Sequence, residues 1–294
     1  MHGLHKLLAA AAPQLDRDAV NRQDGQKRTP LHVASSCGHL PMIKALLKRG
    51  ANPAIQADDG QTALHLAATQ GCAAIQQALL DHAADLVSNT NIALQTPLHC
   101  AVTREHGASV KLLLARGAPA NAQDRDGCSA LFQAAGLGST SIVRILLEHV
   151  GGGVDLEMRD HKGRTALHIA ARKSHIAVLR LLLDRGAKVN AVDGHGKTAL
   201  FEAVAAGNKA GVQLLLDRKA DINARDERGR AVLMYACEDR RLAPVEILRN
   251  AGADVNAKDK LGWTALIIAV RAGGDKVTRL LLDSHADITW RNSE

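Results

Sequence analysis

The chain has 294 residues, of which 46% are hydrophobic, and its 37 lysines and arginines outnumber its 30 aspartates and glutamates, giving a net charge of +7. Only two Phe, one Tyr and two Trp are present, too few for a module that stacks single-stranded nucleic acid on exposed rings. No apolar run approaches the ~20 residues of a membrane span. We expect no secretory signal, because the apolar patch from Leu7 to Ala12 is short and runs into Pro13.

A four-residue motif recurs along the chain at nearly constant spacing, beginning with Thr-Pro-Leu-His at Thr29. Successive copies are separated by 33, 34, 33, 36, 33, 33 and 33 residues. A fixed period of this size indicates an array of one supersecondary unit in which each copy is stabilised by its neighbours. The eight copies are Thr29–His32, Thr62–His65, Thr96–His99, Ser129–Phe132, Thr165–His168, Thr198–Phe201, Ala231–Met234 and Thr264–Ile267.

Within each copy the residue types predict a turn followed by two short helices. An Asp-x-x-Gly element such as Asp160 to Gly163 opens the copy, because Asp bonds its own backbone and Gly accepts a positive φ. The Thr that follows is placed to cap a first helix through Leu-His-x-Ala-Ala. A glycine then ends the first helix before a second, leucine-rich helix begins. That second helix ends at a glycine suited to a left-handed C-cap. The breaks are expected at Gly38, Gly71, Gly138 and Gly207, and the C-caps at Gly50, Gly117, Gly186 and Gly252.

Several copies depart from this pattern. Lys27 in the first copy and Leu94 in the third stand where the turn glycine belongs. The seventh copy has Ala231 for Thr and Met234 for His, so we expect it to lose the polar bonds at its helix start and to be locally weaker. The fourth copy carries three extra glycines, which predict a softer joint at 151–153, either as a plain loop expansion or as a hinge.

These motifs resemble the ankyrin repeat family over nearly the whole chain. The resemblance implies an all-α repeat solenoid, a stack of antiparallel helix pairs with projecting β-turn fingers. Residues 1–23, with Leu7-Leu8 and the segment from Val20, resemble a partial repeat, and the array occupies 24–294. Stacked arrays need covered ends, so either Trp290 covers the last repeat or the chain is part of something longer. The eight repeats start near residues 24, 57, 91, 124, 160, 193, 226 and 259.

The sequence offers little catalytic or metal-binding chemistry. Gly196-Lys197-Thr198 matches the end of a phosphate-binding loop, but Ala191 stands where that motif needs its first glycine. The motif histidines recur at one repeat position, so stacking sets them ~8–10 Å apart, too far to share a zinc ion. We expect each to bond backbone between neighbouring turns. The chain is therefore predicted to be non-enzymatic and to need no cofactor or metal, with an enzyme site assembled across repeats as the alternative.

Positive charge gathers on one predicted face of repeats five to eight, formed in ankyrin-like stacks by the fingers and the exposed side of the first helix. Nine cations stand there against three acidic residues, with Trp263 at the far end. We predict that this face binds an acidic segment of a protein partner, with Trp263, and in addition Phe201 or Tyr235, as apolar anchors. The predicted contact residues are Lys162, Arg164, Arg172, Lys173, Lys197, Arg228, Arg230, Lys260, Trp263 and Arg271, and the acidic residues are Glu227, Glu238 and Asp239.

Two other interpretations of this face stay open. The charges can simply form a solvated surface that keeps an Ala- and Leu-rich array soluble. Alternatively, the partner is nucleic acid or another phosphate-bearing ligand, which a basic face permits. The scarcity of aromatic residues and the acids within the patch argue against nucleic acid.

The family resemblance also implies a possible modification. Ankyrin repeats are substrates of an asparaginyl hydroxylase, and Asn256 matches its preferred surroundings best, with Asn223 and Asn190 matching less well. The alternative is that each of these asparagines only bonds the turn.

Cysteine usage bears on the compartment. The five cysteines are odd in number and form no Cys-x-x-Cys pair, which disfavours a disulfide scaffold and favours a reducing environment. We therefore expect an intracellular protein, cytoplasmic or nuclear, that is monomeric and does not span a membrane.

Overall fold

The computed structural model describes residues 17–149 and 153–289, which form short helices joined by turns and loops. Isolated β-bridges join Val192 with Thr198 and Arg225 with Ala231, and Gln123 and Ser129 are bridge residues as well. A short helix, α2 (Arg17–Val20), precedes eight helix pairs, and a 3-10 helix, η1 (Ala84–Ser88), follows α6. The predicted all-helical repeat architecture is confirmed. The pairs are α3 (Pro30–Ser36) with α4 (Leu40–Lys48), α5 (Ala63–Thr69) with α6 (Ala73–His82), α7 (Pro97–Thr103) with α8 (Gly107–Ala115), α9 (Ala130–Leu137) with α10 (Thr140–Glu148), α11 (Ala166–Arg172) with α12 (Ile176–Asp184), α13 (Ala199–Ala205) with α14 (Lys209–Asp217), α15 (Val232–Glu238) with α16 (Leu242–Asn250), and α17 (Ala265–Ala272) with α18 (Asp275–Leu282).

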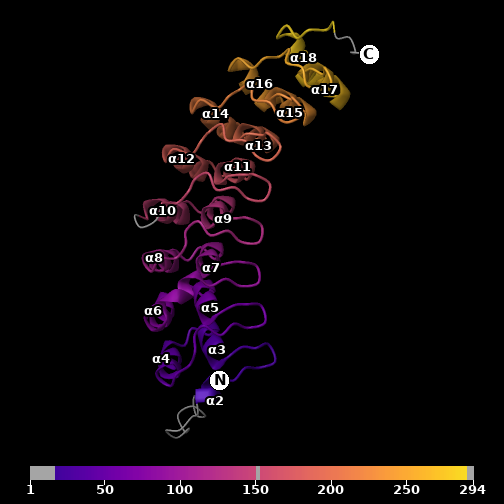
Figure 1. Cartoon of the computed structure of the whole chain (residues 1–294). Helices are drawn as coiled ribbons and strands as arrows, with labels where there is room; N and C mark the ends of the chain where they lie inside the picture. The colour runs from indigo at the N-terminus through magenta and orange to yellow at the C-terminus, as the bar shows by residue number, and fades with distance from the viewer. Residues whose placement is uncertain (1–16, 150–152, 290–294) are drawn as a thin grey trace. The chain divides into compact units, whose positions relative to one another are not determined.

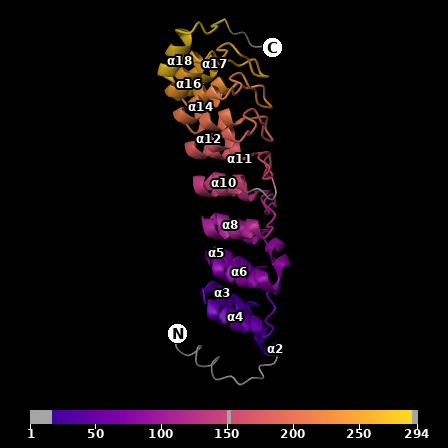
Figure 2. The ribbon, with the colours of Figure 1, turned by 90° about the vertical axis from the view of Figure 1, so that its left-hand side faces the viewer.

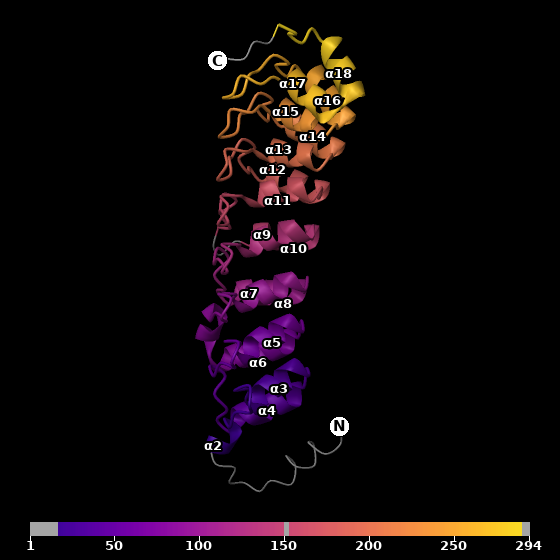
Figure 3. The same ribbon diagram turned by 90° about the vertical axis from the view of Figure 1, so that its right-hand side faces the viewer.

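The described residues form two compact units. Unit 1 comprises 17–125 with 148–149 and 153–154, and unit 2 comprises 126–147 and 155–289. In unit 1 the first helices α3, α5 and α7 pack in one row beside the second helices α4, α6 and α8. In unit 2 the first helices α9, α11, α13, α15 and α17 form one row and α12, α14, α16 and α18 another (Figure 1). The fingers of unit 2 all leave the helices on one side (Figures 2 and 3).

The core of each unit consists mainly of leucine and alanine. In the first helices of unit 2, Leu131, Leu167, Leu200 and Leu233 are at most 2% exposed. Burying one leucine stabilises a fold by about 1.5–3 kcal/mol. Alanines between these leucines let neighbouring helices approach closely, so the repeats build a dense core with almost no aromatic rings.

The recurring Thr and His form hydrogen bonds at the start of the first helix, and the His also contacts the next repeat. The backbone N–H of Thr165 donates to Nδ1 of His168 (3.2 Å), and the Thr165 hydroxyl lies 2.9 Å from the same nitrogen. Nε2 of His168 lies 3.0 Å from the carbonyl oxygen of Lys197 in the following finger. His32 and His65 make the equivalent contacts. The prediction that these histidines form hydrogen bonds with the backbone of neighbouring turns is confirmed.

The glycine predictions are also confirmed, and so are the predicted threonine caps except at Thr198, whose hydroxyl has no hydrogen-bond partner. The glycines predicted at the helix breaks and C-caps all have φ between 69° and 89°. Lys27 and Leu94 adopt the same left-handed conformation without being glycine, with φ of 56° and 57°. In the seventh repeat Ala231 offers no side-chain cap and Met234 is only 1% exposed, so a bond such as that between Thr165 and His168 is absent there. Its local weakness stays a prediction.

Some predicted features fall on residues that the structure does not describe. Leu7-Leu8, Trp290 and the first two glycines of the softer joint at 151–153 lie outside the described residues. In the parts that are described, no helix combines the length and the apolar character that crossing a membrane requires.

Candidate functional site

The fingers of unit 2 are joined by one backbone hydrogen bond at each step. The N–H of Glu227 donates to the carbonyl of His195 (2.9 Å), and that of Lys260 donates to the carbonyl of Arg228 (3.0 Å). Inside each finger an aspartate closes the turn, as where Asp226 Oδ1 accepts the N–H of Arg228 (2.9 Å). Side chains at equivalent finger positions therefore form a row from repeat five to repeat eight.

Two of the predicted contact arginines are held inside the fingers by ion pairs. Arg164 Nη2 lies 2.6 Å from Asp160 Oδ2, and Arg230 Nη2 lies 3.1 Å from Asp226 Oδ2. The arginine side chains are only 15% and 19% exposed, and both carboxylates are 3% exposed. Burial raises the pKa of each carboxyl, but hydrogen bonds from Arg164, and from Tyr235 and the Arg230 backbone, outweigh it, so both pKa values lie below the usual range. These arginines stiffen the fingers, which the four-residue spacing from Asp to Arg could have indicated.

Four other predicted contact residues carry uncompensated charge. Lys162, Lys173, Arg228 and Lys260 are exposed, and none of them forms an ion pair with any residue in the described ranges. Three come from the fingers and Lys173 follows the end of α11. Because they are unpaired, their charges are available to a ligand.

The remaining predicted cations are positioned by a neighbouring side chain. Arg172 Nε lies 3.9 Å from Glu202 Oε2, and the Arg172 side chain is 54% exposed. Lys197 Nζ lies 4.5 Å from the ring centroid of Tyr235. The guanidinium carbon of Arg271 lies 4.9 Å from the ring centroid of Trp263. Cation–π contacts of this kind orient a cation without neutralising it.

Two of the three acidic residues predicted on the same face are paired with an arginine. Each has a cationic neighbour within salt-bridge distance, although that of Glu227 is a histidine, which is charged only when protonated. The contacts are Glu227 Oε2 to His195 Nδ1 (3.7 Å), Glu238 Oε2 to Arg230 Nη1 (3.4 Å) and Asp239 Oδ2 to Arg241 Nε (3.2 Å). The net charge of the face is therefore positive, because of the unpaired lysines and arginine.

The structure corrects one predicted apolar anchor. Phe201 is 1% exposed, because it replaces the motif histidine and its ring packs edge-on against Tyr235, with centroids 5.1 Å apart. Tyr235 is half-buried and donates its hydroxyl to Asp226 (2.7 Å), so it offers little free surface. Trp263 in the last finger is partly exposed. Leu261, which no motif singled out, is 68% exposed in the same finger, at a turn position where the three preceding fingers carry a basic side chain.

The three asparagines named as possible modification sites are exposed and engaged with the next repeat. Asn190 Oδ1 accepts the backbone N–H of Asp221 (2.8 Å), Asn223 Oδ1 accepts that of Asp254 (3.0 Å), and Asn256 Oδ1 accepts that of Asp287 (2.7 Å). These bonds match the structural alternative stated for them. Modification itself stays a prediction.

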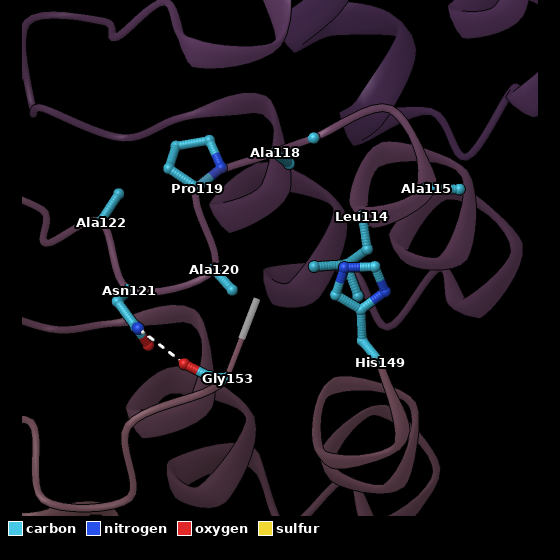
Figure 4. Close-up of a pocket in the computed structure, with 10 residues that line it drawn as sticks. Leu114, Ala115, Ala118, Pro119, Ala120, Asn121, Ala122, His149 and Gly153 are labelled. Carbon is cyan, nitrogen blue, oxygen red and sulfur yellow. Dashed lines mark hydrogen bonds between the residues drawn. The ribbon is translucent and has the colours of Figure 1, made fainter. Parts of the chain in front are cut away.

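A pocket of about 670 Å³ lies in unit 1 at the end of α8. Leu114 and His149 lie on one side of it, and on the other Asn121 Nδ2 donates to the carbonyl of Gly153 (3.0 Å) (Figure 4). Its lining otherwise consists of alanine, glycine and proline, and no nucleophile is paired with a base. Within the described residues, no group of three or more His, Cys, Asp or Glu side chains is placed to hold a metal ion.

Comparisons with known proteins agree with this architecture. The family model described as "Ankyrin repeats (3 copies)" matches residues 3–90, 86–160, 150–226 and 200–292. The B-cell lymphoma 3 protein homolog of Mus musculus is 39% identical over 140 residues, which cover 46% of this chain and 31% of that protein. The nuclear factor NF-kappa-B p105 subunit of Gallus gallus is 32% identical over 188 residues, 63% of this chain and 19% of that protein.

A solved structure is similar over most of the chain. The crystal structure of the ankyrin repeat domain of Bcl-3, described as a unique member of the IkappaB protein family, matches with a TM-score of 0.67 and 31% identity, covering 88% of this chain and 100% of that one. The chain spans about a third or less of the length of the two curated relatives. Since the family model matches successive segments from residue 3 to residue 292, the chain belongs to the ankyrin repeat family.

Proposed function

We propose that this protein is a non-enzymatic interaction scaffold that binds an acidic segment of another protein along the fingers and first helices of repeats five to eight. The observation that carries the proposal is the set of unpaired, exposed cations Lys162, Lys173, Arg228 and Lys260 on a face where Glu238 and Asp239 pair with arginines. Charge complementarity of this kind favours acidic partners and speeds their association.

Apolar contact at one end of the face complements the charge. Trp263 and Leu261 lie in the finger of repeat eight, and a tryptophan buried on binding commonly contributes much of the binding free energy. The two curated relatives match this chain only over part of their length, so they support a protein-binding role and no particular partner. We propose that the protein is a monomer, and that it works in the cytoplasm or nucleus because its five free thiols suit a reducing compartment.

The test uses a fluorescein-labelled oligoglutamate of about nine residues, ~30 Å long when extended. Its affinity for the full chain is measured by fluorescence anisotropy at low and at high salt. Reversing charge in Arg172→Glu/Lys173→Glu is expected to weaken binding about tenfold, and raised salt is expected to weaken it as well. The matched control is Lys44→Glu/Lys48→Glu on α4 of unit 1, which makes the same charge change at exposed positions away from the face. Equal affinities for the wild type and the Arg172/Lys173 variant contradict the proposal.

A phosphate-bearing partner is the second candidate, because the same unpaired cations can contact phosphates. An RNA oligonucleotide of equal charge in the same assay separates the two. Tighter binding of RNA than of oligoglutamate, with a steep loss at high salt, favours the nucleic-acid interpretation.

A further inference from the structure

One carboxylate inside the basic face of unit 2 has a single, long ion pair within the described residues. Glu202 belongs to the first turn of α13 in repeat six, and its side chain is 15% exposed. Its one ion pair within the described ranges is the 3.9 Å contact from Glu202 Oε2 to Arg172 Nε, and no described residue donates a hydrogen bond to it. Its carboxylate oxygens still reach the surface, since neither is among the buried polar atoms that lack a hydrogen-bond partner. Glu202 therefore keeps acceptor capacity that the chain itself does not use.

The neighbours of Glu202 explain why it has no closer partner. At the same position of the first helix, repeat five has Ile169 and repeat seven has Tyr235, neither of which carries a charge. Lys197, five residues earlier in the same repeat, places its ammonium 4.5 Å from the Tyr235 ring centroid and forms no ion pair with Glu202. A carboxylate offers about four lone-pair sites, so space for a donor from outside remains chemically open.

This arrangement has a consequence for a ligand that crosses the face. A uniformly acidic segment gains from the unpaired cations but brings a carboxylate against Glu202 at repeat six, where like charges repel. A segment with a basic side chain at that point gains a charge-assisted hydrogen bond instead. Repulsion of the wrong ligand and attraction of the right one then act at a single residue.

We propose that Glu202 determines the specificity of this face: the preferred partner segment is acidic on both sides of one Lys or Arg, and that cation pairs with Glu202. The inference rests on the proposed function of the face. It adds the charge pattern of the partner, acidic–basic–acidic, to its overall acidity.

The test compares three fluorescein-labelled peptides of equal length, about nine residues, against the full chain. One is all glutamate, one carries a single Lys at its centre, and one carries the same Lys at its end. The wild type is expected to bind the central-Lys peptide about tenfold more tightly than the all-glutamate peptide, and the end-Lys peptide no better than all-glutamate. Glu202→Gln should reverse that order. The matched control, Glu227→Gln, removes a carboxylate that is 61% exposed on a finger and should keep the wild-type order.

The outcomes separate this inference from the proposed function. If the peptides bind but Glu202→Gln keeps the wild-type order, the role of Glu202 is wrong while the acidic-segment proposal stands. If the central and end positions of Lys are equivalent in the wild type, the inference fails in the same way. If no peptide binds the wild type, the proposed function fails and the inference with it. Matching thermal melting of the variants and the wild type shows that the comparison concerns folded protein.

Discussion

At the residue scale, the motif histidine shows how one side chain links two repeats. Nδ1 of His65 accepts the backbone N–H of Thr62 (3.2 Å), while Nε2 faces the carbonyl oxygen of Gln95 (3.0 Å). The neutral ring with its proton on Nε2 satisfies both contacts, whereas a second proton on Nδ1 would oppose the Thr62 N–H. Burial lowers the pKa of His65 to about 4, and it also lowers the pKa of His32 and His168.

These shifts predict that the protein loses stability as the pH falls below about 6.5, the pKa of an unfolded histidine. Between that value and the folded pKa of His65, about 4, the unfolded chain binds more protons than the folded chain. The stability is therefore complete above this window and declines through it, by about 3 kcal/mol for His65 alone. Urea unfolding across the window should show a flatter pH dependence for His65→Gln. His195→Gln is the control, since the His195 side chain is 72% exposed, and an unchanged slope in His65→Gln contradicts the prediction.

A second residue-level prediction concerns the helix start in repeat six. The hydroxyl of Thr198 is buried without a hydrogen-bond partner, because Phe201 replaces the histidine that bonds the equivalent threonines. Thr198→Val should therefore leave the free energy of unfolding unchanged or raise it slightly. Thr165→Val, which removes the bond to His168, should cost about 1 kcal/mol. Urea midpoints of the two variants measure the difference, and an equal loss in both would sink the explanation.

At the scale of the element, each finger needs a left-handed residue at the end of its turn. Gly60, Gly127 and the equivalent glycines of later fingers supply it with φ between 74° and 77°. Leu94 adopts φ 57° although its side chain brings a Cβ that disfavours this conformation. Leu94 is also 49% exposed, so little burial offsets the strain.

Leu94→Gly is therefore expected to stabilise the free protein by about 1 kcal/mol, because it removes the Cβ atom that disfavours the left-handed conformation. Lys27 is a less clean site, since its Nζ pairs with Asp58 Oδ1 at 3.1 Å. Gly60→Ala is the opposing control, because its Cβ would lie 2.7 Å from the backbone nitrogen of Ile92. Urea unfolding should move in opposite directions for the two variants. A lower midpoint for Leu94→Gly shows that the strain argument is wrong.

At the scale of the whole molecule, each repeat is stabilised by the repeats beside it. Ala171, Val204 and Cys237 occupy one position near the ends of successive first helices, and each is 0% exposed. Val270 occupies the same position in α17 and is 60% exposed. Among the described residues, repeat eight therefore has a packed neighbour on one side only.

Hydrogen exchange should reveal this difference. The amides of α17 and α18 are expected to exchange faster than those of α11 and α12, because opening a repeat with one neighbour breaks fewer contacts. Mass spectrometry of peptides from the two regions, at equal pH and temperature, provides the measurement. Equal protection of the amides of repeats five and eight from exchange contradicts this prediction.

The amino-acid sequence by itself determined the repeat, its turns, its caps and the sign of the charge on one face. These features follow from local rules: glycine at a positive φ, threonine before a helix and leucine against the next copy. The four-residue spacing from Asp160 to Arg164 could also have indicated that these two side chains form an ion pair. Only the tertiary structure decided that Phe201 is buried and that Glu202 lacks a close partner. Burial and ion pairing at these positions depend on distances between side chains of different repeats, which spacing along one chain does not specify.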